Sequence, residues 1–298
     1  MKEIHIINPQ AGSKKKKNRH FSEVEIYETK EHGDLERYVS EVCKTDPDVH
    51  FTVYGGDGTV CEAVNGIMKA GEEASRRAVL SVVPSGTGND FVRNFKDADG
   101  SVRRIDVIKV NDVYCANMIN IGFDCDVVAE TDKIKKFPLT SGSFGYVVGV
   151  LKMLLKKLGT RLVINFMSDK GDAIEEDRSY LLSSVSNGGY CGGGFHSSPP
   201  AKLDDGLMDI MIVDNLKKST FLKLVGAYRK GSHVDPETCE VKGGFKKILR
   251  YYRTDRAIFE GLTRICIDGE IIYTDRAEMT VVPSSLNVQM PAKSVYDE

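Results

Sequence analysis

The sequence predicts an α/β domain followed by a mostly β domain. Its first hundred residues alternate short apolar runs with amphipathic helical stripes, which is typical of a parallel sheet flanked by helices. Beyond about residue 105, short β-rich runs follow one another with few helical patterns between them. A length of 298 residues also favours two domains of ordinary size over one.

The elements of the first part are clear from their periodicity. Apolar residues recur at Leu35, Val39, Val42 and Cys43, the spacing of an amphipathic helix, and a second such stripe covers 60–68. We expect strands at 3–9, 49–54 and 78–84.

The second part reads as a mostly antiparallel β domain. Helical patterns are expected only over 142–158 and 219–229. The expected strands cover 105–110, 113–123, 161–167, 180–188, 207–214, 264–275 and 277–283.

Composition narrows the class of protein. Lys and Arg number 41 against 43 Asp and Glu, a net charge of −2, so the chain as a whole is not a nucleic-acid binder. Its 7 cysteines are an odd number without CxxC pairs, as expected for reduced thiols in a cytosolic protein. The longest apolar stretch is too short to span a bilayer. We therefore expect a cytoplasmic protein that touches a membrane at most peripherally.

A glycine-rich loop follows the expected strand at 49–54. It contains Gly56, Asp57 and Gly58, and Thr59 with Glu62 has the spacing of a capping box that would start a helix just after the loop. The positive end of that helix would face whatever the loop holds, and a phosphate group fits. Asp57 suits such a site if Mg²⁺ stands between its carboxylate and the phosphate. A plain capped glycine turn is the alternative interpretation.

A second loop of the same kind, Ser85-Gly86-Thr87-Gly88-Asn89-Asp90, follows the next strand. The carboxyl ends of neighbouring parallel strands form the usual ligand-binding edge of an open α/β sheet. Two such loops at one edge predict a nucleoside triphosphate site. Neither loop has the P-loop or the GxGxxG spacing.

At this point the chain resembles a known family, the soluble bacterial diacylglycerol kinases and their ceramide and sphingosine kinase relatives. The match includes INPQAG at 7–12, Thr29 with Gly33-Asp34, and GGDGTVCEAVNGI at 55–67. It continues with PSGTGNDFVR at 84–93, YCGGGFHSSPPAKLDDGLMDI at 190–210 and IDGE at 267–270. GGDGT also occurs in NAD kinases, whereas the later blocks are specific to the lipid kinases.

The resemblance implies a Rossmann-like, phosphofructokinase/NAD kinase-like nucleotide-binding domain and a β-sandwich domain, with ATP in the cleft between them. We expect the first domain to comprise 1–108 joined by the carboxy-terminal segment 283–298, and the second to comprise 109–282. One departure is Cys61, where the family often has Asn. The ATP-binding residues that carry over are Asn8, Pro9, Gln10, Ala11, Gly12, Thr29, Gly56, Asp57, Gly58, Thr59, Glu62, Ser85, Gly86, Thr87 and Asp90.

Phosphoryl transfer to an alcohol needs a neutralised γ-phosphate and a carboxylate that accepts the hydroxyl proton. On sequence alone, Asp268-Gly269 is a two-residue hairpin turn. The resemblance assigns this segment to the catalytic base region, with Asp268 as the base and Glu270 as the alternate or a supporting partner. Asp57 and Asp90 would hold the catalytic Mg²⁺.

A second Mg²⁺ site is implied at the bend 202–207. The resemblance makes it structural, with the Asp205 carboxylate and the main-chain carbonyls of Lys202 and Leu207 as ligands. Asp209 lies close enough in sequence to join the cleft network. Without the resemblance, the segment reads as a turn.

The residues that would bind the substrate are marked less clearly in the sequence. An apolar stripe over 144–155 carries Lys152 and is followed by Lys156 and Lys157; it is either a core helix or a helix beside a lipid pocket at an anionic membrane surface. The expected activity is ATP- and Mg²⁺-dependent phosphorylation of a lipid hydroxyl, with diacylglycerol as the default acceptor giving phosphatidic acid. Alternatives are another lipid alcohol or sphingoid base, NAD, and a regulator without turnover. A homodimer is allowed.

Overall fold

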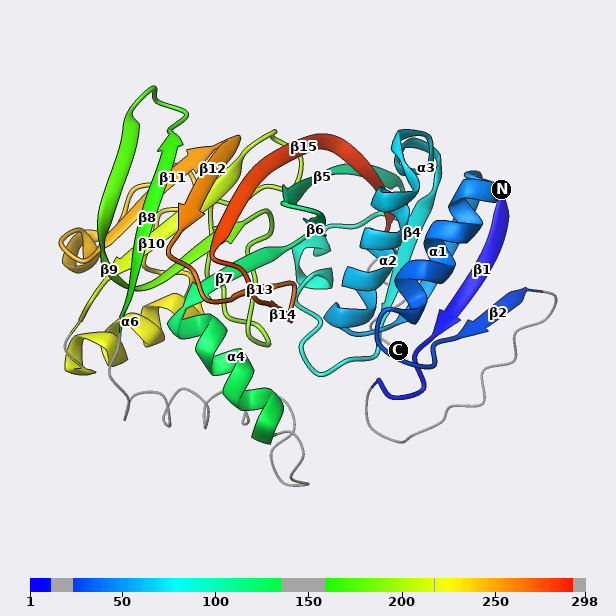
Figure 1. Cartoon of the computed structure of the whole chain (residues 1–298), viewed down its shortest axis with the longest axis horizontal. Helices are drawn as coiled ribbons and strands as arrows, with labels where there is room; N and C mark the ends of the chain where they lie inside the picture. The colour runs from blue at the N-terminus through cyan, green and yellow to red at the C-terminus, as the bar shows by residue number, and fades with distance from the viewer. Residues whose placement is uncertain (12–23, 135–158, 217, 292–298) are drawn as a thin grey trace.

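The computed structural model describes residues 1–11, 24–134, 159–216 and 218–291. Within these ranges the strands form one mixed sheet that runs through both halves of the molecule (Figure 1). Its central path has the order β14-β13-β7-β9-β8-β12-β15-β4-β3-β1-β2. Gly12, the basic cluster at 14–19 and the expected helix at 142–158 lie outside the described residues.

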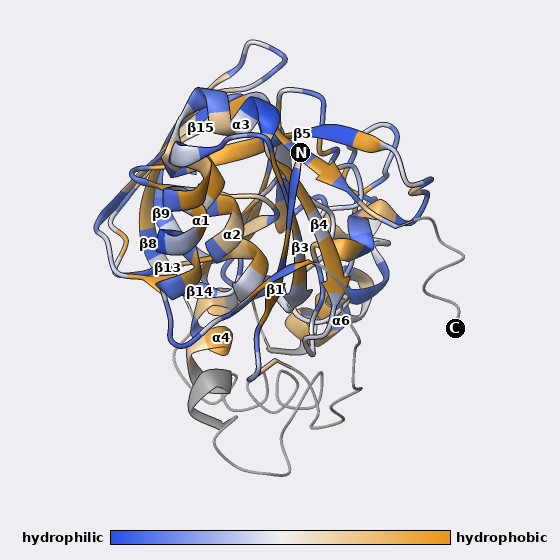
Figure 2. Ribbon diagram, turned by 90° about the vertical axis from the view of Figure 1, so that its right-hand side faces the viewer, coloured by the Kyte–Doolittle hydropathy of each residue, from blue (hydrophilic) through white to orange (hydrophobic). Residues whose placement is uncertain are grey.

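The amino-terminal half is the expected α/β unit, and Figure 2 shows its strands and helices face on. β1, β2, β3 and β4 are mutually parallel. The strands are β1 (Lys2–Ile7), β2 (Glu25–Glu28), β3 (Val49–Gly55) and β4 (Val79–Pro84), and the helices are α1 (Asp34–Thr45), α2 (Asp57–Ala70), α3 (Glu72–Arg77) and the 3-10 turn η1 (Val92–Phe95).

Helices α1 and α2 pack against each other through their apolar stripes. Val39 and Cys43 of α1 and Val64 of α2 belong to one buried cluster with the strands. Gly66 lies at the contact, where a Cβ would come within 2.7 Å of the Glu36 carbonyl oxygen and of the Val39 Cβ. The close approach of the two helices therefore requires glycine at position 66.

In the part of the chain that the structure describes, the carboxy-terminal half consists mostly of antiparallel strands, with two longer helices. Its strands are β5 (Val102–Val110), β6 (Val113–Cys115), β7 (Met118–Gly122), β8 (Thr160–Met167), β9 (Ala173–Ser186), β10 (Met208–Asp214), β11 (Leu249–Thr254), β12 (Arg256–Glu260), β13 (Ile265–Ile267), β14 (Glu270–Ile272) and β15 (Arg276–Gln289). Its helices are α4 (Phe123–Ile134), α6 (Lys218–Lys230) and the 3-10 turn η2 (Gly243–Phe245).

Alternate residues of these strands face two different buried clusters. In β7, Ile119 and Ile121 belong to a core with β8, β12 and β13, whereas Met118 faces α4 and α6. Phe123 of α4 and Phe221 of α6 meet on that second face with ring centroids 4.8 Å apart. The layered packing agrees with the expected β-sandwich.

Strand β15 connects the two halves, and Figure 1 shows it in red, passing above the molecule from one half to the other. Its first part pairs with β12 and its last part with β4, while β5 pairs along most of its length. Leu286 and Val288 belong to the core of the amino-terminal half, whereas Met279 and Val281 belong to the core of the other half. This change of core along β15 supports the domain boundary that we propose near residue 283.

Most of the expected elements are confirmed, and the differences are local. The segment 113–123 divides into β6, β7 and the first residue of α4, and α4 itself, α3, β2, β11 and β12 were not expected from the sequence. All 7 cysteines are free thiols, and six are buried. Among the described helices, none combines the length and apolar character needed to cross a bilayer.

Candidate active site

A cleft of about 840 Å³ lies where the two halves meet, and both halves contribute to its walls. Most of the residues expected to bind ATP line it, although Pro9 and Ser85 do not, and Gly12 lies outside the described residues. The expected residues that line the cleft are Asn8, Gln10, Ala11, Thr29, Gly56, Asp57, Gly58, Thr59, Glu62, Gly86, Thr87, Asp90, Asp268 and Glu270.

The two glycine loops touch each other backbone to backbone. A Cβ on Gly86 would lie 2.5 Å from the Cα of Gly56. The backbone N–H of Ser85 donates to the Gly55 carbonyl at 2.9 Å, which fixes one loop against the other. Only glycine allows this approach, so the cleft wall here is bare backbone, as a bulky anion requires.

Helix α2 begins at Asp57, three residues earlier than a capping box on Thr59 would place it, and no side chain caps it. The capping-box prediction is therefore wrong. Thr59 Oγ1 instead accepts a hydrogen bond from Asn8 Nδ2 at 3.0 Å, and Glu62 Oε2 accepts from the backbone N–H of Leu35 at 3.1 Å. The helix N-terminus faces the cleft without a side-chain cap, so its N–H groups are available to a phosphate.

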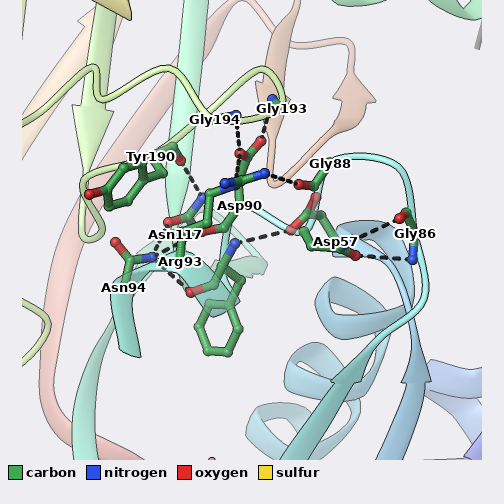
Figure 3. A network of polar contacts seen from close by, with 12 residues as sticks. Asp57, Gly86, Gly88, Asp90, Arg93, Asn94, Asn117, Tyr190, Gly193 and Gly194 are labelled. Carbon is green, nitrogen blue, oxygen red and sulfur yellow. Dashed lines mark hydrogen bonds and ion pairs between the residues drawn. The ribbon is translucent and has the colours of Figure 1, made fainter. Parts of the chain in front are cut away.

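Asp57 and Asp90 both line the cleft and lie near each other (Figure 3). Asp57 Oδ1 accepts a hydrogen bond from the Phe91 N–H at 3.1 Å. Asp90 accepts from the N–H groups of Gly193 and Gly194, at 2.8 and 2.7 Å. The loop after β4 is therefore tied both to α2 and to the β-rich half.

When both are ionised, these two carboxylates carry like charges that repel each other. Burial, and secondly the negative charge of Asp57, raise the pKa of Asp90 to about 6. Burial also raises the pKa of Asp57. A divalent cation bound between them would remove this repulsion, and carboxylate oxygens are the ligands that Mg²⁺ prefers. The donor set at Asp57 and Asp90 therefore fits the expected Mg²⁺.

Asp268 occupies the turn between β13 and β14 with φ 47°, which confirms the hairpin expected from Asp268-Gly269. Its Oδ1 accepts hydrogen bonds from the N–H groups of Asn117 and Met118 and from the Cys115 thiol. Among the described residues, Oδ2 accepts only from the Ala116 N–H, at 2.7 Å. Burial raises the pKa of Asp268. Oδ2 thus keeps a lone pair for a proton, on a carboxylate of increased basicity.

Glu270 lies on the other side of the turn with a side chain that is 40% exposed. A Cβ on Gly58 would come within 3.0 Å of its Oε1, so the carboxylate lies against the start of α2. His32 stands between two acidic side chains, with Nδ1 3.2 Å from Glu62 and Nε2 3.9 Å from Glu270. This turn therefore supplies the cleft with two carboxylates able to accept a proton, both partly exposed.

The bend at 202–207 differs from the cation site that the resemblance implies. The Asp205 carboxylate forms an ion pair with Arg253 and accepts from the Leu207 N–H at 3.2 Å. Arg253 Nε also lies 3.5 Å from Asp209, and burial raises the pKa of Asp209 to about 7. Arg253 already supplies positive charge here, so a structural Mg²⁺ on Lys202, Asp205 and Leu207 stays a prediction.

Asp209 is not part of the cleft. It lies fully buried on β10 and is absent from the cleft walls, so the expectation that it joins the cleft network is wrong. The reason is strand geometry: residue 209 pairs with Ser186 and Arg253 inside the β-rich half.

Sequence reasoning missed several residues of the cleft. His32 lies in the segment before α1, where no pattern marks a lone histidine. Asn117 lies in the short connection between β6 and β7, and Met118 and Asn120 lie on β7; the sequence predicted a single strand over this whole segment. The β-rich half also contributes the apolar side chains of Met118, Val128, Cys191 and Cys266 to the cleft wall.

Comparisons with known proteins show which family this chain is similar to. The model of the diacylglycerol kinase catalytic domain matches residues 3–117, and that of the YegS C-terminal NAD kinase beta sandwich-like domain matches residues 117–290. A "Probable lipid kinase YegS-like" of Stenotrophomonas maltophilia is 27% identical over 91% of this chain and 87% of its own length. A protein of the same name from Xanthomonas oryzae pv. oryzae is 29% identical over 90% of this chain and 87% of its own length.

A solved structure shares the fold. The crystal structure described as a diacylglycerol kinase from Bacillus anthracis superposes with a TM-score of 0.69, covering 99% of this chain and 98% of that chain at 23% identity. The two family models together span both halves of the molecule, and each half has the architecture that its model describes. The chain therefore belongs to the family of YegS-like and diacylglycerol kinase-like lipid kinases.

Proposed function

We propose that this lipid kinase transfers the γ-phosphate of ATP to a lipid hydroxyl in a reaction that depends on Mg²⁺, with diacylglycerol as the acceptor and phosphatidic acid as the product. The observation that carries the proposal is the make-up of the cleft. Bare glycine backbone and an uncapped helix N-terminus line one wall, and Asp268 and Glu270 lie on the wall of the β-rich half, beside the apolar side chains of Met118 and Cys266.

The amino-terminal half holds the nucleotide. The Gly56 and Gly86 loops and the start of α2 would take the phosphates, and Asn8 with Thr59 fixes the neighbouring segment. Asp57 and Asp90 would hold Mg²⁺, which neutralises the charge of the phosphates. The hydrogen bond from the Gly193 N–H to Asp90 would hold the carboxylates proposed to bind Mg²⁺ in place relative to the half that binds the acceptor lipid.

The proton of the reacting hydroxyl passes to a carboxylate of the cleft. We assign this role to Asp268, because Oδ2 has spare acceptor capacity and burial raises its pKa. The lipid oxygen forms a bond to the γ-phosphorus while the bond to the bridging oxygen of ADP breaks, and the proton stays on Asp268 until it is released to solvent. Glu270 is the alternate acceptor of this proton.

Lipids other than diacylglycerol could also serve as the acceptor. A sphingoid base or another lipid alcohol would present a similar hydroxyl beside an apolar chain, whereas NAD would need a polar wall where Met118 and Val128 lie. Since the acceptor resides in a bilayer, we propose a cytoplasmic enzyme that meets the inner face of the membrane peripherally. A homodimer is compatible with this arrangement.

An ATP-consumption assay with a panel of acceptors tests the proposal. Purified protein is supplied with ATP, Mg²⁺ and diacylglycerol, monoacylglycerol, sphingosine or NAD. We expect ADP formation that depends on diacylglycerol and stops when EDTA removes Mg²⁺. ADP formation with NAD alone, or no response to any lipid, would contradict the proposal and favour the NAD kinase or regulator alternatives.

A further inference from the structure

The wall that the β-rich half contributes to the cleft contains a side-chain oxygen that nothing in the described part of the chain satisfies. Asn120 lines the cleft, and its side chain is 8% exposed. Its Oδ1 is buried and has no hydrogen-bond partner among the described residues. A buried carbonyl oxygen without a partner is costly, so a wall of this kind is suited to a ligand that supplies the missing hydrogen bond.

A second orphaned group lies beside it on the same sheet face. Ser184 of β9 pairs directly with Asn120 of β7, so both side chains leave the sheet on one side. Directly opposed residues have Cβ atoms roughly 4.5–5.5 Å apart. The Ser184 hydroxyl is also fully buried and without a partner in the described ranges, and no hydrogen bond joins it to Asn120.

The direct neighbours of this pair across the sheet are sulfur-bearing side chains. Cys266 of β13 pairs with Asn120 on one side, and Met211 of β10 pairs with Ser184 on the other. Val128 of α4 and Met118 complete this part of the cleft wall. The amide and hydroxyl thus form a pair of orphaned polar groups beside sulfur-bearing side chains, on the same side of the cleft as the turn that carries Asp268.

We propose that Asn120, supported by Ser184, is a positioning and specificity residue that binds a second hydrogen-bonding group of the acceptor, next to the hydroxyl that is phosphorylated. This inference rests on the proposed function. The amide can accept a hydrogen bond from a hydroxyl or donate one to an ester carbonyl, because a flip of the side-chain amide exchanges the positions of its oxygen and its NH₂ group. The site therefore selects lipids with a polar group beside the reacting hydroxyl over simple fatty alcohols with the same chain.

The test compares acceptors across matched variants. Asn120→Leu keeps the size of the side chain but removes the amide, and Ser184→Ala removes the hydroxyl. Ser183→Ala is the control, because Ser183 is equally buried but its Oγ donates to the Met211 carbonyl at 2.9 Å. Phosphorylation of 1,2-dioctanoylglycerol and of 1-octanol is measured as kcat and KM, with ATP hydrolysis in the absence of lipid as the second readout.

We expect N120L to lower kcat/KM for dioctanoylglycerol by roughly 10- to 100-fold, and S184A by a smaller factor. In N120L and S184A, activity towards octanol and ATP hydrolysis without lipid should stay near the wild-type values. S183A should match the wild type with both acceptors. An equal loss for both acceptors in N120L, or no loss for either, overturns the inference.

Equilibrium binding separates this inference from the proposed function. The Kd of dioctanoylglycerol is measured for the wild type and N120L without ATP, with octanol as the reference ligand. If the wild type binds dioctanoylglycerol more tightly than N120L yet phosphorylates no lipid, the subsite stands and the kinase proposal fails. If the wild type phosphorylates dioctanoylglycerol while N120L binds and uses it equally well, the kinase proposal stands and the subsite fails.

Discussion

The carboxylate of Asp90 accepts a hydrogen bond from the backbone N–H of Gly193 at 2.8 Å, across the line where the two halves of the chain meet. The N–H of Gly194 donates to the same carboxylate at 2.7 Å. Gly192, Gly193 and Gly194 all have positive φ, between 58° and 105°, a conformation that favours glycine. The three glycines therefore let backbone N–H groups converge on a carboxylate of the other half (Figure 3).

Replacing Asp90 should weaken both the fold and the activity. In Asp90→Asn the amide nitrogen faces N–H donors, so one hydrogen bond is lost and a donor is left unsatisfied. We expect a loss of about 1–3 kcal/mol in the free energy of unfolding, measured by urea denaturation, and at least about a tenfold loss in phosphoryl transfer. The control is Asp97→Asn, an exposed carboxylate of the same segment. Wild-type activity in D90N would show that neither the hydrogen bonds from Gly193 and Gly194 nor a carboxylate at position 90 is needed for the reaction.

Gly86→Ala should disrupt the nucleotide wall, because the new Cβ would lie 2.5 Å from the Cα of Gly56. The loops must separate, so we expect a rise of about tenfold or more in the KM for ATP. Gly226→Ala is the matched control, since no atom lies within 4 Å of its Cβ position in α6. That control should gain about 0.5–1 kcal/mol of stability from helix propensity. Equal ATP affinity in G86A and the wild type would place the nucleotide elsewhere.

The two cleft carboxylates can be distinguished by pH dependence. A general base acts when deprotonated, so kcat/KM rises with pH through its pKa, and burial places the pKa of Asp268 above the usual aspartate range. We expect Asp268→Asn to lower kcat about 10²- to 10⁴-fold. Glu270→Gln should keep the acid limb of the profile. If instead E270Q loses the acid limb and D268N keeps it, Glu270 is the base.

Asp268 also accepts hydrogen bonds from the N–H groups of Ala116, Asn117 and Met118. The stability of D268N must therefore be measured together with its kinetics. A drop in activity that matches the fraction unfolded would assign Asp268 a purely structural role. We expect D268N to remain folded at 20 °C while turnover is lost.

His233 should make the fold sensitive to acid. It is fully buried, its Nε2 lies 3.0 Å from the Ser197 carbonyl, and burial lowers its pKa to about 4. Its pKa is lower when folded than when unfolded, so the unfolded chain binds more protons between about pH 6.5 and 4. The stability that neutral His233 contributes is therefore present above pH 6.5 and lost as the pH falls towards 4.

The measurement is urea unfolding at intervals from pH 7.5 to 4.5 for the wild type and His233→Gln. We expect H233Q to be less stable at pH 7.5 but to show a shallower loss of stability on acidification. Parallel curves for the two proteins would mean that another group controls the acid response.

The elements that the sequence predicted well are those whose periodicity is strong and local. α1 and β3 show alternation or helical spacing over their whole length, and the sharp turn at Asp268-Gly269 needs only its own two residues. α4 was missed because Phe123 continues the apolar run of β7, so that the strand and the helix merge in the sequence.

The contacts of the site depend on tertiary structure and could not be predicted in the same way. The Asp268 carboxylate meets N–H groups about 150 residues earlier in the chain, for which no spacing rule exists. The capping box failed because Thr59 and Glu62 have stronger partners in Asn8 and in the Leu35 N–H. Asp209 was misplaced because closeness in sequence to the bend at 202–207 does not decide which side of a strand faces the cleft.

Transfer of radioactive phosphate from γ-labelled ATP tests the central claim most directly. Purified protein is incubated with Mg²⁺ and vesicles containing dioleoylglycerol, and the lipid extract is analysed for labelled phosphatidic acid. We predict label in the lipid for the wild type, none after EDTA treatment, and at most about 1% of the wild-type rate in D268N. Label that appears only as free phosphate, or labelled lipid that forms at the same rate in D268N, would contradict the account.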